Sequence, residues 1–200
     1  MFTALQALLN TWAVSFDLPI LDWIQAHLQC GFLDKVMPII TLFGDGGVFW
    51  ILVAVALLFF AKYRKTGFSM GMALILGLLV CNIFLKPQVA RIRPYDYQWQ
   101  YFQKEITLLI SAQHDFSFPS GHTIASFEAC TVLMLHDKRM GIPATVLAIL
   151  IAFSRLYLYV HYPTDVLVSL VLGILFGFLG NFLVNLIYKK FVYKGKYIEE

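Results

Sequence analysis

Charged residues are scarce in this sequence, and their scarcity excludes several classes of protein. Asp, Glu, Lys and Arg make up 14% of the 200 residues, whereas 60% are hydrophobic. Soluble domains usually carry about 25% charged residues. The formal net charge is only +3, and the basic residues are scattered among apolar runs, so no nucleic-acid partner is expected. The composition is that of an integral membrane protein.

Two further features are missing. The three cysteines, Cys30, Cys81 and Cys130, are far apart and form no CxxC pair, which argues against a disulfide framework or a zinc site. The apolar residues 1–16 lack the basic start and the small-residue cleavage site of a secretory signal. We therefore interpret them as part of the mature protein.

Long hydrophobic runs, in contrast, are abundant. Five stretches approach the about 20 apolar residues that cross a bilayer as a helix, namely 48–61, 68–85, 123–135, 142–159 and 166–188. We predict an all-α integral membrane protein with five to six transmembrane helices and a single membrane domain over residues 1–200. Residues 47–190 would form its helical core and 191–200 a cytoplasmic tail. Residues 1–46 would either lie in the membrane interface or form a first span.

The charges in the loops predict an orientation. If the five spans alternate, one side of the membrane receives the basic segments 62–65 and 136–139 and the lysines after residue 188. Positive loops favour the cytoplasm, so the segment 86–120 and the loop around His161 are assigned to the opposite side. That side carries cations against the usual bias, namely Lys86, Arg91, Arg93 and Arg155. An anionic ligand is the simplest reason to keep them there.

Three polar clusters converge on this non-cytoplasmic end, and together they suit phosphoryl transfer. Lysine and arginine side chains bind phosphate oxygens, and the free N–H groups at a helix start favour an anion. Histidine exchanges protons near neutral pH. Asp165 follows His161 by four residues, so its carboxylate could hold one ring nitrogen and leave the other free to attack. The clusters comprise Lys86 and Arg93, then Ser120, Gly121 and His122, then Arg155, His161 and Asp165.

These clusters resemble the signature motifs of the type 2 phosphatidic acid phosphatase family, a membrane-bound group of lipid phosphate phosphatases. The family shares its site with vanadium haloperoxidases and glucose-6-phosphatase. The matching residues, complete and in order, are Lys86-x6-Arg93-Pro94, Pro119-Ser120-Gly121-His122 and Ser154-Arg155-x5-His161-x3-Asp165.

The resemblance implies a role for each residue of the motifs. His161 would be the nucleophile that forms a phosphohistidine, Asp165 would hold its ring, and His122 would protonate the leaving group. Phosphate would be bound by Lys86, Arg93, Ser120, the Gly121 backbone N–H and Arg155. The family needs no metal, and the sequence has no dense acidic cluster at that end for magnesium. No metal or other cofactor is therefore expected.

The substrate is less defined than the chemistry. Undecaprenyl pyrophosphate is favoured by the small size, the outward site and the extra Arg91. The alternative is a glycerolipid phosphate such as phosphatidic acid or phosphatidylglycerophosphate. We predict a multi-pass plasma-membrane protein whose active site faces the extracytoplasmic side and whose partners are lipids. The oligomeric state stays open.

Three ionisable residues lie outside the motifs, and two other classes of function are possible for the chain. Arg91 could contact a second phosphate or a lipid headgroup, His114 is expected outside the site, and Glu128 is a structural or gating candidate. A haloperoxidase would use the same pocket for vanadate, but the chain is short and hydrophobic for one. A transporter or lipid-binding protein without enzymatic activity would not need both motif histidines and Asp165 together.

Overall fold

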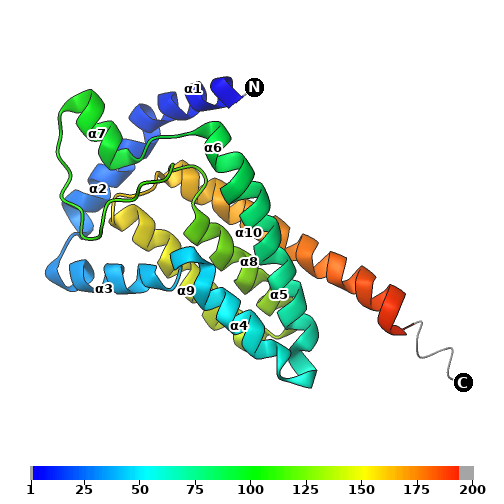
Figure 1. Ribbon diagram of the computed structural model, residues 1–200. Helices are drawn as coiled ribbons and strands as arrows, with labels where there is room; N and C mark the ends of the chain where they lie inside the picture. Colours follow the sequence, from blue (N-terminus) through cyan, green and yellow to red (C-terminus); the bar gives the residue numbers. More distant parts are fainter. Residues whose placement is uncertain (1, 194–200) are drawn as a thin grey trace, which may run out of the picture.

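The computed structural model describes the backbone of residues 2–193 and the side chains of residues 6–190. All regular structure in this part of the chain is helical (Figure 1). Four helical runs are long and apolar enough to cross a membrane, namely Gly31–Leu58, Ala61–Phe102, Lys138–Tyr157 and Pro163–Lys190. The prediction of an all-α membrane bundle is confirmed. Most of the predicted cytoplasmic tail, residues 194–200, lies outside the described residues.

The bundle is built from long helices that pack side by side (Figure 1). They are α4 (Val48–Leu58), α5 (Arg64–Gly77), α8 (Gly121–His136), α9 (Lys138–Tyr157) and α10 (Pro163–Ile187). The α5 helix continues through a π-helical segment, Leu78–Leu85, into the short α6 (Lys86–Val89). All five predicted hydrophobic stretches therefore form helices of one bundle.

Helix α8 lies in the middle of the bundle and packs against α5, α9 and α10. It has 16 residues, fewer than the about 20 that a lipid-exposed span needs, and its neighbours bury most of its surface. Glycines on α10 allow the close approach, because a Cβ added at Gly173 or Gly177 would lie within 2.8 Å of α8 atoms. Small residues at such crossings are typical of membrane helix packing.

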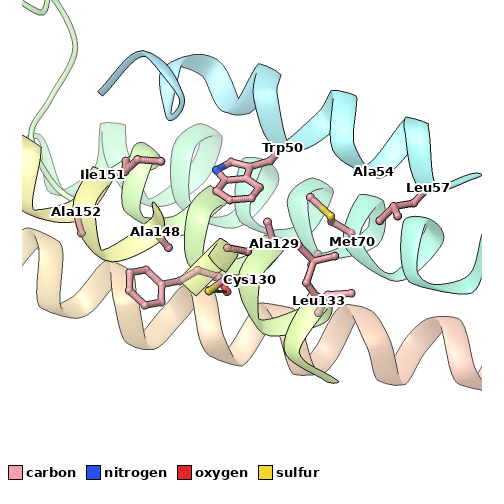
Figure 2. Close-up of a cluster of buried hydrophobic side chains, with 14 of the residues drawn as sticks. Trp50, Ala54, Leu57, Met70, Ala129, Cys130, Leu133, Ala148, Ile151 and Ala152 are labelled. Atoms are coloured by element: carbon pink, nitrogen blue, oxygen red, sulfur yellow. Dashed lines mark hydrogen bonds between the residues drawn. The ribbon is translucent and has the colours of Figure 1, made fainter. Parts of the chain in front are cut away.

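The hydrophobic core fills the space between α4, α5, α8 and α9. Figure 2 shows Trp50 between α4 and α8, with Met70, Ala129 and Ile151 around it. The Trp50 indole N–H donates to Ser126 Oγ at 3.0 Å, which satisfies its one polar atom. The outward face of α10 is apolar and exposed, as expected for a surface that contacts lipid tails rather than water.

The N-terminal helices cross the end of the bundle, a placement that the sequence left open. They are α1 (Phe2–Trp12), α2 (Leu18–Leu28) and α3 (Gly31–Leu42) (Figure 1). Helices α2 and α3 are tied to the end of α9, where Gln25 donates to the Tyr157 carbonyl at 2.8 Å and Tyr157 Oη donates to Asp34 at 2.6 Å. Two glycines with positive φ, Gly46 and Gly47, redirect the chain between α3 and α4.

The helix connections place the predicted motifs at one end of the bundle and the basic loops at the other. Helix α6, the start of α8 and the loop between α9 and α10 meet beneath α1 and α2 (Figure 1). At the opposite end, Tyr63 Oη donates to Asp137 Oδ2 at 3.4 Å, which links the α4–α5 and α8–α9 turns. The alternation expected from the hydrophobic pattern therefore agrees with the structure.

Candidate active site

His161 lies in the short loop between α9 and α10. Pro163 opens α10, because its fixed φ suits the first helical position, and Asp165 then falls in the first turn. The His161 side chain is buried, and its Nδ1 atom lies 3.6 Å from Asp165 Oδ2. The structure brings the two residues together as expected, but this distance is too long for a direct hydrogen bond.

The hydroxyl group of Ser117 stands between the two side chains. Its Oγ lies 3.4 Å from His161 Nδ1 and donates to Asp165 Oδ2 at 2.5 Å. On the other side of the ring, Arg93 Nη1 donates toward His161 Nε2 at 3.3 Å, which requires a lone pair on Nε2. The proton is therefore assigned to Nδ1. Ser117 belongs to no motif, so the sequence alone did not identify it.

The electrostatic surroundings keep the His161 ring neutral. Burial lowers the pKa of His161 well below 6.5, and the nearby cations Arg93, Arg155 and Lys86 lower the pKa further. A neutral imidazole with a lone pair on one ring nitrogen is the nucleophilic form of this side chain, and His161 lines the cavity beside Arg93.

His122, the second predicted catalytic histidine, begins α8 and lines the same cavity of about 680 Å³ as His161. Its Nε2 atom lies 2.6 Å from Asp45 Oδ1 in the turn between α3 and α4. That turn can approach because Gly44 has no side chain: a Cβ there would lie 2.6 Å from His122 Cδ2. Asp45 belongs to none of the motifs, and no spacing in the sequence marks it as a partner of His122.

Three predicted cations also line this cavity. Lys86 opens α6, Arg93 precedes α7 (Pro94–Phe102), and Arg155 lies in the last turn of α9. Segments that are far apart in sequence thus place their positive charges around one space. This arrangement suits a dianionic phosphoryl group, which presents several oxygens to several donors.

Two of these cations are paired with Asp115, in the loop between α7 and α8. Lys86 Nζ lies 2.5 Å from Asp115 Oδ2, and Arg93 Nη2 contacts Oδ1. Burial alone would raise the pKa of Asp115, but the pairs with Lys86 and Arg93 outweigh it and hold the pKa below its ordinary value. The Asp115 side chain is 54% exposed, so this carboxylate occupies donors that a phosphate could take over.

The buried Arg155 guanidinium has more hydrogen-bond donors than partners among the described residues. Its Nη1 donates to Thr41 Oγ1 at 2.6 Å, whereas Nε and Nη2 have no hydrogen-bond partner among the described residues. Unsatisfied guanidinium donors are costly in a buried site. An anion in the cavity would satisfy them.

Ser120 lies behind the cavity rather than on its wall. Its side chain is buried and accepts a hydrogen bond from Thr123 Oγ1 at 3.0 Å, and its backbone N–H donates to Ser169 Oγ at 2.7 Å. The first bond lies within the start of α8, and the second ties that start to α10. Gly121, the next residue, lines the cavity. The phosphate-binding role expected for Ser120 and Gly121 stays a prediction.

Arg91 pairs with two carboxylates and does not line the cavity. Its side chain is fully buried behind His161, where Nη1 lies 2.5 Å from Asp165 Oδ1 and Nη2 lies 2.7 Å from Asp17 Oδ2. The guanidinium also covers the Tyr162 ring at 3.7 Å. Asp17 accepts from the Thr164 backbone N–H at 2.9 Å. The N-terminal segment thus contacts the residues behind His161, an arrangement that the sequence did not reveal.

The remaining expectations concern metals and His114. Within the described residues, no group of three His, Cys, Asp or Glu side chains is placed to hold a metal ion. His114 does not line the cavity. The arrangement as a whole offers a neutral imidazole, a second imidazole and three cations around one space, which is what transfer of a tetrahedral phosphoryl group requires.

Comparison with known proteins agrees with this chemistry. Residues 62–190 match the model of the PAP2 superfamily. The chain is 32% identical to an undecaprenyl-diphosphatase of Sulfolobus acidocaldarius, over 76% of this chain and 71% of that protein. It is also 32% identical to phosphatidylglycerophosphatase B of Bacillus subtilis, over 89% and 88% of the two chains.

A solved structure extends the similarity to the fold. The PAP2-type phosphatidylglycerolphosphate phosphatase of Bacillus subtilis superposes with a TM-score of 0.69 at 28% identity, covering 95% of this chain and 93% of that one. Sequence, fold and site chemistry therefore agree: this chain belongs to the PAP2 superfamily and is a membrane-embedded phosphatase.

Proposed function

We propose that the protein hydrolyses a lipid phosphate or pyrophosphate through a phosphohistidine at His161. The observation that carries the proposal is the neutral His161 ring, whose Nε2 lone pair lies beside Arg93 Nη1 at 3.3 Å in a cavity lined by three cations. These cations would neutralise the charge on the phosphoryl oxygens.

In the first step, Nε2 attacks phosphorus and the bond from phosphorus to the leaving oxygen breaks. His122 lines the same cavity. Burial and Arg155 lower its pKa to about 4 in the free site, and the negative charge of a bound phosphate would raise this pKa. The resulting imidazolium would give its proton to the leaving oxygen and become neutral. In the second step, water attacks phosphorus, His122 takes a proton from the water, and the P–N bond breaks to release inorganic phosphate. Asp45, which now contacts His122 Nε2, would give way to the leaving oxygen.

The mechanism is tested by trapping the intermediate. The wild-type protein, mixed with a radiolabelled lipid phosphate and quenched in alkali, should carry acid-labile phosphate, and vanadate should inhibit turnover. His161→Ala should abolish both turnover and labelling. His136→Ala is the matched control, because His136 contacts Asn181 at the opposite end of the bundle. Labelling that survives in His161→Ala would rule out the proposed nucleophile.

We further propose that the site faces the extracytoplasmic side, because the basic loops lie at the opposite end of the bundle. Cys30, which lies next to the site end and is the exposed cysteine of the three, provides a test. A membrane-impermeant maleimide should label it in intact cells, and Cys30→Ser should remove the label. Labelling that appears only after lysis would reverse the orientation.

Two substrate classes remain as candidates. Undecaprenyl pyrophosphate is supported by the similarity to undecaprenyl-diphosphatases of Sulfolobus acidocaldarius and Bacillus subtilis. Arg91, whose extra charge favoured this substrate in the sequence, pairs with Asp17 and Asp165 and so adds no support from the structure. A glycerolipid phosphate is supported by the longer match to phosphatidylglycerophosphatase B and by the carboxyl group of Glu128 in the cavity wall. Phosphate release from a panel of purified lipids separates the two.

A further inference from the structure

Glu128 is a buried carboxyl group with no partner. It lies in the middle of α8, is 1% exposed, and its Oε1 atom accepts no hydrogen bond within the described structure. A carboxyl group inside a membrane bundle is costly unless another group satisfies it. The proposed chemistry at His161 does not use Glu128, so its presence needs another explanation.

The neighbouring helix is shaped to accommodate this carboxyl group. A Cβ added at Gly77 of α5 would lie 1.9 Å from Glu128 Oε1. Both residues also line the cavity that contains His122 and His161. The bare backbone of α5 therefore leaves the carboxyl group at the wall of the active-site cavity.

The cavity that contains Glu128 is largely apolar away from the cations. Apart from Asn82, its lining residues near Glu128 include Ile51, Leu74, Leu78, Ile124 and Ala125. His122 and Glu128 are six residues apart on α8, which corresponds to about 9 Å along the helix axis. A cavity of this length and polarity suits the part of a lipid that adjoins its phosphate.

We infer that Glu128 binds the glycerol-ester linkage of the substrate, with its carboxylic acid donating to an ester carbonyl oxygen. The inference rests on the proposed function, which places the phosphate at His161. In a diacylglycerol phosphate, the ester carbonyls follow the phosphate after a few bonds and come within reach of Glu128. A polyprenyl chain has no hydrogen-bond acceptor at that depth and would leave the acid unsatisfied.

The test compares two lipids that differ only in the acceptor. Diacyl phosphatidic acid and its dialkyl-ether analogue have the same chains, but the ether lacks both carbonyl oxygens. Wild-type protein in nanodiscs should hydrolyse the diacyl lipid with a kcat/KM about five- to tenfold above that of the ether, as expected for one neutral hydrogen bond. Glu128→Leu should bring this ratio close to one, whereas Glu128→Gln, which keeps an N–H donor, should retain most of it.

Thr131→Val is the matched control, because Thr131 lies one turn further along α8 and does not line this cavity; it should keep the wild-type ratio. Hydrolysis of nitrophenyl phosphate reports whether the catalytic centre of each variant is intact. If Glu128→Leu does not fold, the wild-type ratio and Glu128→Gln decide.

Three outcomes would overturn the inference: a wild-type ratio near one, an unchanged ratio in Glu128→Leu, or a preference of the wild type for undecaprenyl pyrophosphate over the diacyl lipid. Failure of the proposed function looks different. In that case the wild type would hydrolyse none of these substrates, or would hydrolyse them without a phosphohistidine.

Discussion

Carboxylates flank His161 in two regions that differ in burial. Behind the ring, Asp17 and Asp165 share Arg91, and all three side chains are fully buried. In front of it, Asp115 pairs with Lys86 and Arg93 while 54% of its side chain is exposed. The same types of charge thus form a sealed network on one side and an open one on the other.

The difference in burial separates two tasks. A buried pair has no water to replace a lost partner, so its members depend on each other. An exposed carboxylate is readily solvated, so it can leave when a phosphate arrives. The rear network is suited to holding the nucleophile in one orientation, whereas the front network is suited to exchange with substrate.

The difference between the two regions is tested most directly by removing one cation from each. Arg91→Met removes the cation that Asp17 and Asp165 share. It should cost about 3–5 kcal/mol of stability, although the hydrogen bonds from Thr164 and Ser117 remain. Loss of orientation at His161 should also lower kcat by about 100-fold or more. Lys86→Met should raise KM and leave the unfolding temperature nearly unchanged. Thermal unfolding and steady-state kinetics of both variants provide the measurement, and equal stability losses would refute the distinction.

Crowding the front of the site should have the next largest effect. Gly44→Ala places a Cβ 2.6 Å from His122 Cδ2 and 2.9 Å from Ile151 Cγ2. The displaced His122 should slow cleavage of alkyl phosphates by about 10- to 100-fold. Nitrophenyl phosphate should be affected less, because its leaving group needs little protonation. Gly71→Ala is the control, since a Cβ at Gly71 meets no atom within 4 Å. Equal losses for both substrates would argue against an acid role for His122.

Removing the exposed carboxylate should have a smaller and opposite effect. Asp115→Asn frees Lys86 and Arg93 for phosphate, so the inhibition constant of inorganic phosphate should fall by about two- to fivefold. Because the pKa of Asp115 is held below its ordinary value, the carboxylate stays ionised above that value, and the effect should not vary near neutral pH. Weaker phosphate inhibition in this variant would show that Asp115 is part of the binding site and not a displaceable group.

The pH dependence of kcat/KM should show the smallest of these effects. The pKa of His161 is lowered well below 6.5, so the ring stays neutral, and loss of kcat/KM by its protonation should begin only at pH values well below 6.5. Arg93→Gln removes one of the cations that lower this pKa, so the acid limb should move to higher pH. A wild-type acid limb centred near 6.5 would contradict the assigned environment of His161.

The features predicted from the sequence are those that depend on local pattern. Hydrophobic runs specify helices, and strict alternation of spans places residues such as Lys86, His122 and His161 at the same end of the bundle. Complete motifs then identify the chemistry. None of this requires knowledge of which helix touches which.

The features that the sequence did not reveal depend on contacts between distant segments. Asp17 reaches Thr164 across 147 residues and Asp45 reaches His122 across 77. Ser117, which no motif includes, lies beside His161. The motif residue Ser120 instead forms hydrogen bonds with Thr123 and Ser169. Side-chain partners of this kind follow from helix packing, which no spacing rule encodes.

Apolar length and motif order are local properties, so the sequence alone was enough to predict a helical membrane bundle with its motifs at one end. Helix packing was needed to show that Arg91 and Asp17 lie behind His161 and that Glu128, in the cavity wall, accepts no hydrogen bond at Oε1 from the described residues. Burial and partnership belong to the packed bundle, since a charge acquires its role from what surrounds it.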